Sequence, residues 1–199
     1  MIPVIIVAHH QRLAMAEKLA AHLQRSHIIV DNENHGAFVS HKMALNMAAQ
    51  MDERVIIMED DAIPVVDFHA RAQRWFDRFP DELLSFYLGT GRPPRWQPNV
   101  DRALADAAAT GTDYIVMSRL IHAVCYSIPA NRIRNVIDRV RGNEADFAIG
   151  RAWGSPIYYP VESLVEHRDG PPVEKHPDGQ PRVERRVARS LAGPLMFDR

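Results

Sequence analysis

Short apolar runs, rich in β-branched residues, alternate with helix-type patterns through the first half of the chain. The apolar runs span residues 2–7, 28–30 and 55–58. Runs of this length without polar alternation are typical of strands buried on both faces. Apolar residues spaced by three and four, as in amphipathic helices, span residues 11–26, 37–51 and 68–79. This order predicts a mostly parallel sheet covered by helices, with right-handed crossovers.

The second half of the chain is less regular. It predicts a strand at 83–89, a helix at 103–109, one or two strands within 113–129, a helix at 131–141 and a strand-like stretch at 156–167. Beyond residue 168 the sequence becomes polar and rich in Pro, Gly and Arg, which favours an extended tail. We therefore predict one α/β domain over residues 1–170 and an Arg-rich tail over 171–199.

Composition places this chain among ordinary soluble domains. Its 199 residues are 46% hydrophobic and 25% charged, enough for one domain with a full core. The net charge of -1 does not indicate nucleic-acid or membrane binding. A single cysteine excludes an internal disulfide framework and suits a reducing compartment. The N-terminus lacks the basic start and cleavage site of a signal peptide, and its apolar run is too short to span a bilayer. These features predict a cytoplasmic protein without a membrane partner.

Polar residues follow each of the first three predicted strands, in "AHHQR", "DNENHG" and "EDDA". In open sheets, ligands bind at the carboxyl ends of the strands, so these stretches should converge on one rim. The third holds the consecutive carboxylates Glu59, Asp60 and Asp61. Carboxylates there can bind Mg²⁺ or Mn²⁺, which would neutralise a diphosphate leaving group. The alternative is a solvated turn before a helix whose N-terminus favours acidic residues.

The stretch "HGAFVSHKMALNMAAQMDERVIIMEDDAIPVVDF" resembles the core of glycosyltransferases with the GT-A fold. It is most similar to the family 25-like group, which includes lipooligosaccharide galactosyltransferases and short phage-encoded enzymes. The later pieces "NEADFAIG" and "ESLVEHRDG" also resemble segments of that group, so the similarity touches most of residues 2–170. Three features depart from the pattern: the chain is short, its acidic triplet is a variant of Asp-X-Asp, and "YLGTGRPPRWQ" matches no general motif.

The resemblance implies a single-domain GT-A (Rossmann-like) fold. It also implies transfer of a hexose from a nucleotide sugar, expected to be a UDP-sugar, to a hydroxyl acceptor with Mn²⁺ or Mg²⁺ as cofactor. By similarity, Asp61 is a metal ligand, and Glu59 or Asp60 is the second acidic partner. Glu59 is assigned to the metal and Asp60 to the donor. His167 would complete the metal shell or touch the diphosphate, unless it is a surface histidine before the tail.

Other residues are predicted to bind the donor. Asp31 follows the second strand, where GT-A enzymes recognise uridine; the alternative is an ordinary turn aspartate. His9 and Arg12 follow the first strand and could contact nucleotide or diphosphate. Lys42, on the helix before the acidic strand, could meet phosphate or sugar, or could face solvent.

The catalytic candidate is Asp146. An inverting sugar transfer needs a base within hydrogen-bond reach of the acceptor hydroxyl, and "NEADFAIG" places Asp146 at the start of a helix. There it could instead be an acidic residue favoured by the helix dipole, or a cap. Arg92 and Trp96, in a Gly/Pro-rich loop, are assigned to the sugar or acceptor site.

The acceptor stays open at this point. Arg182, Arg185, Arg186 and Arg189 could hold a phosphate backbone, and the resemblance to short phage enzymes suggests hydroxymethylated pyrimidines in DNA. A solvated amphipathic helix would explain the same arginines, and a glycan or small molecule is the other acceptor. Metal-dependent nucleotidyl transfer or phosphoester cleavage, or a binding module without turnover, are the rival functions. The sequence fixes neither donor sugar, anomeric outcome nor oligomeric state.

Overall fold

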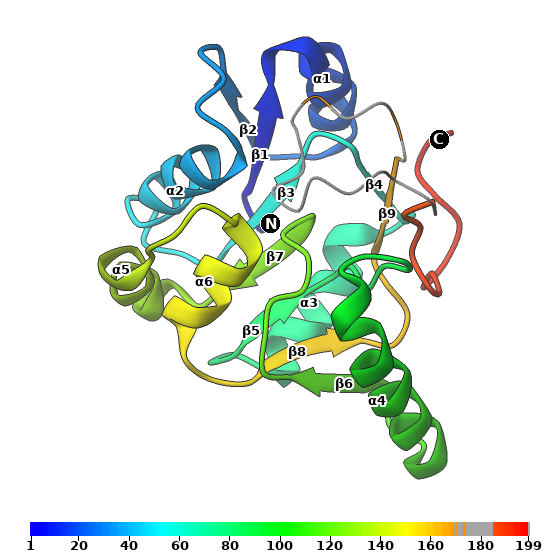
Figure 1. The fold of residues 1–199 in the computed structure, drawn as a ribbon. Coiled ribbons are helices and arrows are strands. Elements are labelled where there is room, and N and C mark those ends of the chain that lie inside the picture. Colours follow the sequence, from blue (N-terminus) through cyan, green and yellow to red (C-terminus); the bar gives the residue numbers. More distant parts are fainter. Residues whose placement is uncertain (169, 171–172, 174–184, 199) are drawn as a thin grey trace.

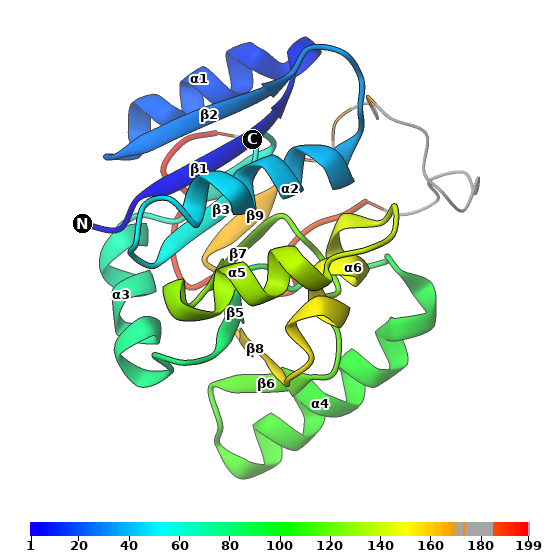
Figure 2. The same ribbon diagram turned by 90° about the vertical axis from the view of Figure 1, so that its left-hand side faces the viewer.

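The computed structural model describes residues 1–168, 170, 173 and 185–198. In this part of the chain, a seven-stranded sheet carries helices on both faces (Figures 1 and 2). The strand order is β2-β1-β3-β7-β5-β8-β6. These strands are β1 (Val4–His9), β2 (Ser26–Asp31), β3 (Val55–Glu59), β5 (Leu83–Ser85), β6 (Tyr114–Met117), β7 (Cys125–Ile128) and β8 (Ile157–Pro160).

The sheet is mixed in direction. Strand β1 pairs in parallel with β2 and β3, and β5 pairs in parallel with β8. Strand β7 runs antiparallel between β3 and β5, and β6 runs antiparallel to β8 at the edge. The one or two strands predicted within residues 113–129 are β6 and β7, which are not neighbours in the sheet: β6 lies at its edge and β7 at its centre.

Two apolar layers cover the faces of the sheet. Side chains alternate along β1, so that Ile5 and Val7 belong to one layer and Val4 and Ile6 to the other. The first layer includes residues of α2 (Ala37–Ala48), α4 (Gln97–Thr110), α5 (Ala130–Arg139) and α6 (Ala145–Trp153). The second includes residues of α1 (Leu13–His22) and α3 (Phe68–Arg78). Burial on both faces explains why the first strand is apolar without alternation.

A separate two-stranded sheet joins distant parts of the chain. Strand β4 (Ala62–Pro64), directly after the acidic triplet, pairs antiparallel with β9 (Val165–His167). In this register Ala62 lies opposite His167. The backbone ladder thus brings the end of the predicted "ESLVEH" segment beside Asp61.

The segment 185–198, drawn in red in Figure 1, packs onto the domain. Leu191, Leu195, Met196 and Phe197 lie partly buried against the layer formed with α1 and α3. Backbone bridges join Val65 to Leu195 and Gly89 to Ala188. The division into a domain over residues 1–170 and a tail over 171–199 stays a prediction, but residues 185–198 are not separate from the domain, because their apolar side chains pack against this layer.

The predicted fold class is confirmed: the described residues form a single α/β domain with a sheet flanked by six α-helices. The strands predicted at 2–7, 28–30 and 55–58 are β1, β2 and β3, and the strand predicted at 83–89 is shorter, ending at Ser85. The prediction of a mostly parallel sheet missed the antiparallel β6 and β7. Strand β4 was not predicted.

Candidate metal centre

A cleft of about 840 Å³ opens where β1, β2 and β3 end. It is lined by the start of α2, the acidic triplet, the loop around Arg92, the start of α6 and His167. This is the rim on which the polar strand ends were expected to converge. Of the predicted site residues, the cleft is lined by His9, Arg12, Asp31, Glu59, Asp60, Asp61, Arg92, Asp146 and His167.

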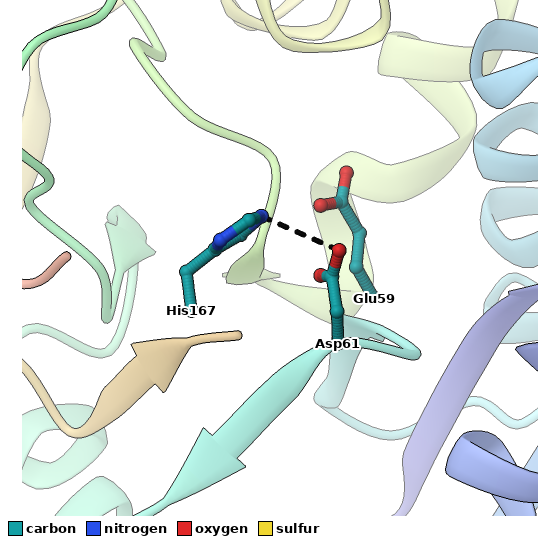
Figure 3. A group of neighbouring side chains, drawn as sticks. All are labelled: Glu59, Asp61 and His167. Atoms are coloured by element: carbon teal, nitrogen blue, oxygen red, sulfur yellow. Dashed lines mark ion pairs between the residues drawn. The ribbon is translucent and has the colours of Figure 1, made fainter. Parts of the chain in front are cut away.

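Glu59, Asp61 and His167 lie together on this cleft (Figure 3). Each offers one ligand atom, and these atoms all lie within 4.8 Å of one another. Glu59 ends β3, Asp61 precedes β4, and His167 ends β9. His167 Nε2 lies 3.3 Å from Asp61 Oδ2. The three residues predicted as metal ligands are thus brought to one point by two different sheets.

The donor atoms of this cluster fit a divalent cation. Among the described residues, Asp61 Oδ1 and His167 Nδ1 are buried without a hydrogen-bond partner. An unpaired buried carboxylate oxygen is costly, and a bound ion would satisfy it. Two carboxylates and one imidazole form a donor set that suits Mn²⁺ and leaves positions for other oxygen ligands. The cluster can therefore hold a metal, and these donors do not single out one ion.

Arg12 links Asp60 and Asp61, the last two carboxylates of the triplet. Its Nη1 donates to Asp60 Oδ1 at 3.3 Å and also to Asp61 Oδ2. Burial alone would raise the pKa of Asp61, but the charges of His167, Arg12 and Arg186 lower it below its usual range. Asp61 is therefore ionised at neutral pH, ready to bind a cation.

Asp60 behaves differently from its neighbour. Burial and the charge of Asp61 raise the pKa of Asp60 to about 6, against the opposing effects of the His9 N–H and Arg12. The His9 amide donates to Asp60 Oδ2 at 2.9 Å. Asp60 thus ties β1 to the triplet, and its oxygens already accept from protein donors.

His41 supports Glu59 from α2. Its Nε2 lies 3.3 Å from Glu59 Oε1 and its Nδ1 lies 3.2 Å from Tyr126 Oη. His41 is buried and lines the cleft, whereas Lys42, predicted to meet phosphate or sugar, is not among the lining residues. Helical geometry explains the difference, since consecutive residues point about 100° apart. The buried face of α2 was the signal that favours His41 over Lys42.

Asp31 is held by the loop that leads into α2. Its carboxylate accepts from the backbone N–H groups of Glu33, His35 and Gly36 at 3.2, 3.0 and 2.9 Å. Burial would raise the pKa of Asp31, but these hydrogen bonds lower it. This is the geometry of a turn aspartate, the alternative to the predicted uridine contact. His9 Nε2 lies 2.7 Å from Asn34 Oδ1 in the same loop.

Asp146 lines the cleft from the first turn of α6. It accepts the Phe147 N–H at 2.8 Å. Burial, helped by the charges of Glu59 and Glu144, raises the pKa of Asp146 to about 7. Helix α6 packs closely against the backbone of Leu120 because residue 150 is a glycine. A Cβ at this position would lie 2.7 Å from the Leu120 nitrogen.

The two residues assigned to the acceptor separate in the structure. Arg92 lines the cleft, and its carbonyl oxygen lies 2.7 Å from His122 Nε2. Trp96 does not line the cleft; it packs, partly buried, against the apolar layer. Trp96, the last residue of η2 (Pro94–Trp96), therefore contacts the apolar layer rather than the cleft.

The predicted arginine cluster has more than one environment. Arg186 lines the cleft, and Arg189 Nη1 lies 2.6 Å from Asp101 Oδ1. Residues 185–198 contain no helix, so a solvated amphipathic helix does not describe them. Arg182 lies outside the described residues. Arg186 and His122 are among the lining residues that the site prediction missed.

No protein-family model matches this chain, and none of the curated proteins matches its sequence. Among solved structures, the chain is similar to "A197 from STIV", with a TM-score of 0.58 and 10% sequence identity. The match covers 100% of this chain and 99% of that one, so the likeness extends over the whole α/β fold. At this identity it shows the fold alone. In the described residues, no helix has the length and apolar character needed to cross a membrane.

Proposed function

We propose that the protein is a metal-dependent glycosyltransferase that moves a sugar from a nucleotide sugar, with UDP-sugars as the first choice, to a hydroxyl acceptor. The observation that carries this proposal is the Glu59–Asp61–His167 cluster on a large cleft at the ends of β1 and β3. Its place after an apolar strand agrees with the GT-A motif order. The cleft is also large enough for a nucleotide sugar, since small-molecule sites span roughly 300–1,000 Å³.

The proposed roles follow from the positions of the side chains. Glu59, Asp61 and His167 would hold Mn²⁺ or Mg²⁺. When bound, the cation would supply charge neutralisation for a departing diphosphate. His9 and Arg12 line the cleft and would contact the donor, and Arg12 also hydrogen-bonds Asp60 and Asp61.

Asp146 is the proposed base. A carboxylate with a pKa near 7 can accept the proton of an acceptor hydroxyl and still be largely ionised just above neutral pH. Asp146 on α6 lines the same cleft as the metal cluster, so a substrate in this cleft could reach both.

Replacing Asp146 with Asn should therefore separate activity from stability. We expect the kcat/KM of the wild type to rise as pH increases through about 7, the pKa of Asp146. Asp146→Asn should lose most of the activity, and the remaining kcat/KM should not show this rise. Because the folded-state pKa is raised, the ionised carboxylate weakens the fold as pH rises from its unfolded value toward 7 and keeps that effect above it. Asn keeps the oxygen that accepts from Phe147 but has no charge to bury.

The checks are a pH–rate profile and thermal melts at pH 5 and pH 8. Asp146→Asn should melt above wild type at pH 8 and match it more closely at pH 5. Retention of the full rate by Asp146→Asn would exclude the base role. As a matched control, Asp138→Asn changes a helical aspartate of α5 and should leave the pH profile unaltered.

The donor is tested by thermal stabilisation with a panel of nucleotides and nucleotide sugars, each with and without Mn²⁺. A ligand at a hundred times its Kd should add about 2.7 kcal/mol to the free energy of unfolding. We expect a Mn²⁺-dependent shift with UDP and with one UDP-sugar, which then enters acceptor screens with hydroxymethylated DNA, glycans and small molecules. Turnover should release UDP. Release of pyrophosphate or phosphate would instead assign nucleotidyl transfer or phosphoester cleavage, and no shift with any nucleotide would contradict the proposal.

A further inference from the structure

Arg186 reaches the cleft from a segment that is fixed on both sides of it. Thr90 Oγ1 donates to the Arg185 carbonyl at 3.1 Å, and the Thr90 N–H donates to the Val187 carbonyl at 2.9 Å. One residue further, the Ala188 N–H donates to Glu166 Oε1 at 2.6 Å. The backbone around Arg186 is therefore held by hydrogen bonds before any ligand binds.

Glu166 connects this segment to the metal cluster. Its carboxylate is only 1% exposed, and the same Oε1 also accepts the N–H of His167 at 2.9 Å. One buried oxygen thus binds the backbone of the proposed metal ligand and the backbone next to Arg186. The position of the arginine and that of the histidine are fixed together.

Arg186 adds a positive charge to the cleft that the cluster also lines. It lines the cleft, and its charge is among those that lower the pKa of Asp61. Its Nε is buried and has no hydrogen-bond partner among the described residues. A buried N–H without an acceptor is unfavourable, and an acceptor atom of a bound anion would satisfy it.

Three positive charges would meet at Asp61 when a metal is bound. Arg12 contacts the Asp61 carboxylate, Arg186 acts on it electrostatically, and the cation would join them. Like charges that share a partly buried site repel each other. An anion that touches the metal and the guanidinium groups would remove this repulsion, and guanidinium groups match phosphate oxygens with paired hydrogen bonds.

We propose that Arg186, together with Arg12, forms an anion subsite beside the metal cluster that takes the diphosphate of the substrate and makes metal and diphosphate binding cooperative. The identity of the anion as a nucleoside diphosphate rests on the proposed function. The subsite itself predicts effects of opposite sign when Arg186 is neutralised. Diphosphate should bind more weakly, because a partner is lost, whereas the metal alone should bind at least as well, because a repelling charge is removed.

The test is isothermal titration of wild type, Arg186→Gln and Arg185→Gln with Mn²⁺ alone and with inorganic pyrophosphate in the presence of Mn²⁺. Arg185 is an exposed neighbour on the same segment and provides the matched control. Arg186→Gln should weaken pyrophosphate binding by roughly tenfold or more, as expected for a lost charge-assisted contact. Its affinity for Mn²⁺ alone should equal or exceed that of wild type. Arg185→Gln should stay within about twofold of wild type for both ligands, as for a solvent-exposed charge.

Unchanged pyrophosphate affinity in Arg186→Gln would overturn the subsite, and so would loss of Mn²⁺ affinity, which would mark Arg186 as structural. Thermal melts verify that the variant is folded. Should it not fold, Arg186→Lys keeps the charge but not the paired donors, and it should still bind pyrophosphate more weakly than wild type. A parallel titration with UDP separates the two proposals. A pyrophosphate effect of the expected sign in a protein that binds no nucleotide would support the subsite and contradict nucleotide-sugar transfer.

Discussion

Asp61→Asn is expected to abolish Mn²⁺-dependent nucleotide binding and to lower turnover by more than about 100-fold. Residues that merely support metal ligands already contribute about 10- to 100-fold, so loss of a charged ligand should exceed that range. The variant should also be less stable without metal, by about 1–3 kcal/mol, since Arg12 and His167 lose a charged partner. The pKa of Asp61 is lower in the folded state than in the unfolded state. Its ionised carboxylate therefore contributes fully to the free energy of unfolding above the unfolded-state pKa, and this contribution is lost as pH falls through the folded-state pKa.

The measurements are titration with Mn²⁺, the nucleotide melt with and without Mn²⁺, and urea unfolding at pH 7. Asp67→Asn is the control, because this substitution makes the same chemical change at an exposed site a few residues away. Its backbone lies in the left-handed region, with φ of 61°, which asparagine adopts readily. A Mn²⁺-dependent shift that survives in Asp61→Asn would remove the metal cluster as the basis of the proposed function.

Arg54→Met is expected to lower the free energy of unfolding by about 3–5 kcal/mol, because several partly buried oxygens lose their charged donor and each one left unsatisfied costs about 1–3 kcal/mol. Arg54 donates to Ser127 Oγ at 3.1 Å and to the carbonyls of Phe79 and Pro80 at 3.0 and 2.8 Å, and it also bonds the Glu82 carbonyl. Its guanidinium lies 4.2 Å from the centre of the Phe76 ring. Burial lowers the pKa of Arg54 to about 10, so it stays charged at neutral pH.

Methionine would preserve much of the stacking on Phe76 but leave these oxygens without their donor. Urea unfolding measures the loss, and Arg74→Met on the exposed face of α3 is the control, expected to stay within about 0.5 kcal/mol. Arg54 precedes β3, at the opposite end of that strand from Glu59. The Mn²⁺ affinity of the folded variant should therefore match wild type, and an equal stability of both variants would contradict the network's role.

The ends of the first three strands could be predicted from the sequence because buried strands are apolar and the polar residues begin where each strand ends. An apolar run such as residues 55–58, buried on both faces, can end in three carboxylates only where something compensates their charge. Strand direction left no such trace. A strand buried on both faces, such as β7, has the same apolar character whether it runs parallel or antiparallel, so the mixed sheet could not be read from the pattern.

The packing of residues 185–198 against the domain was not predicted, because the arginines of the polar stretch outweighed its apolar residues. Leu191, Leu195 and Met196 follow that stretch, and they were the signal that this part of the chain returns to the apolar layer formed with α1 and α3. The placement of Arg186 could not have been read in this way. It depends on Thr90 and Glu166, which are distant in sequence and connect to the segment through backbone hydrogen bonds that no periodicity encodes.

The pairing of β4 with β9 gives a bound cation a second role. Most strands of the large sheet lie between Asp61 and His167 in the sequence. The two residues meet only when the two-stranded ladder of β4 and β9 has formed. An ion held by both would close a very long loop, and an unfolded chain could not offer the same pair of ligands. Metal affinity would then report on the integrity of the entire fold. Substitutions far from the cleft that loosen the ladder should weaken it, and a chelator should lower the unfolding temperature of the protein as a whole.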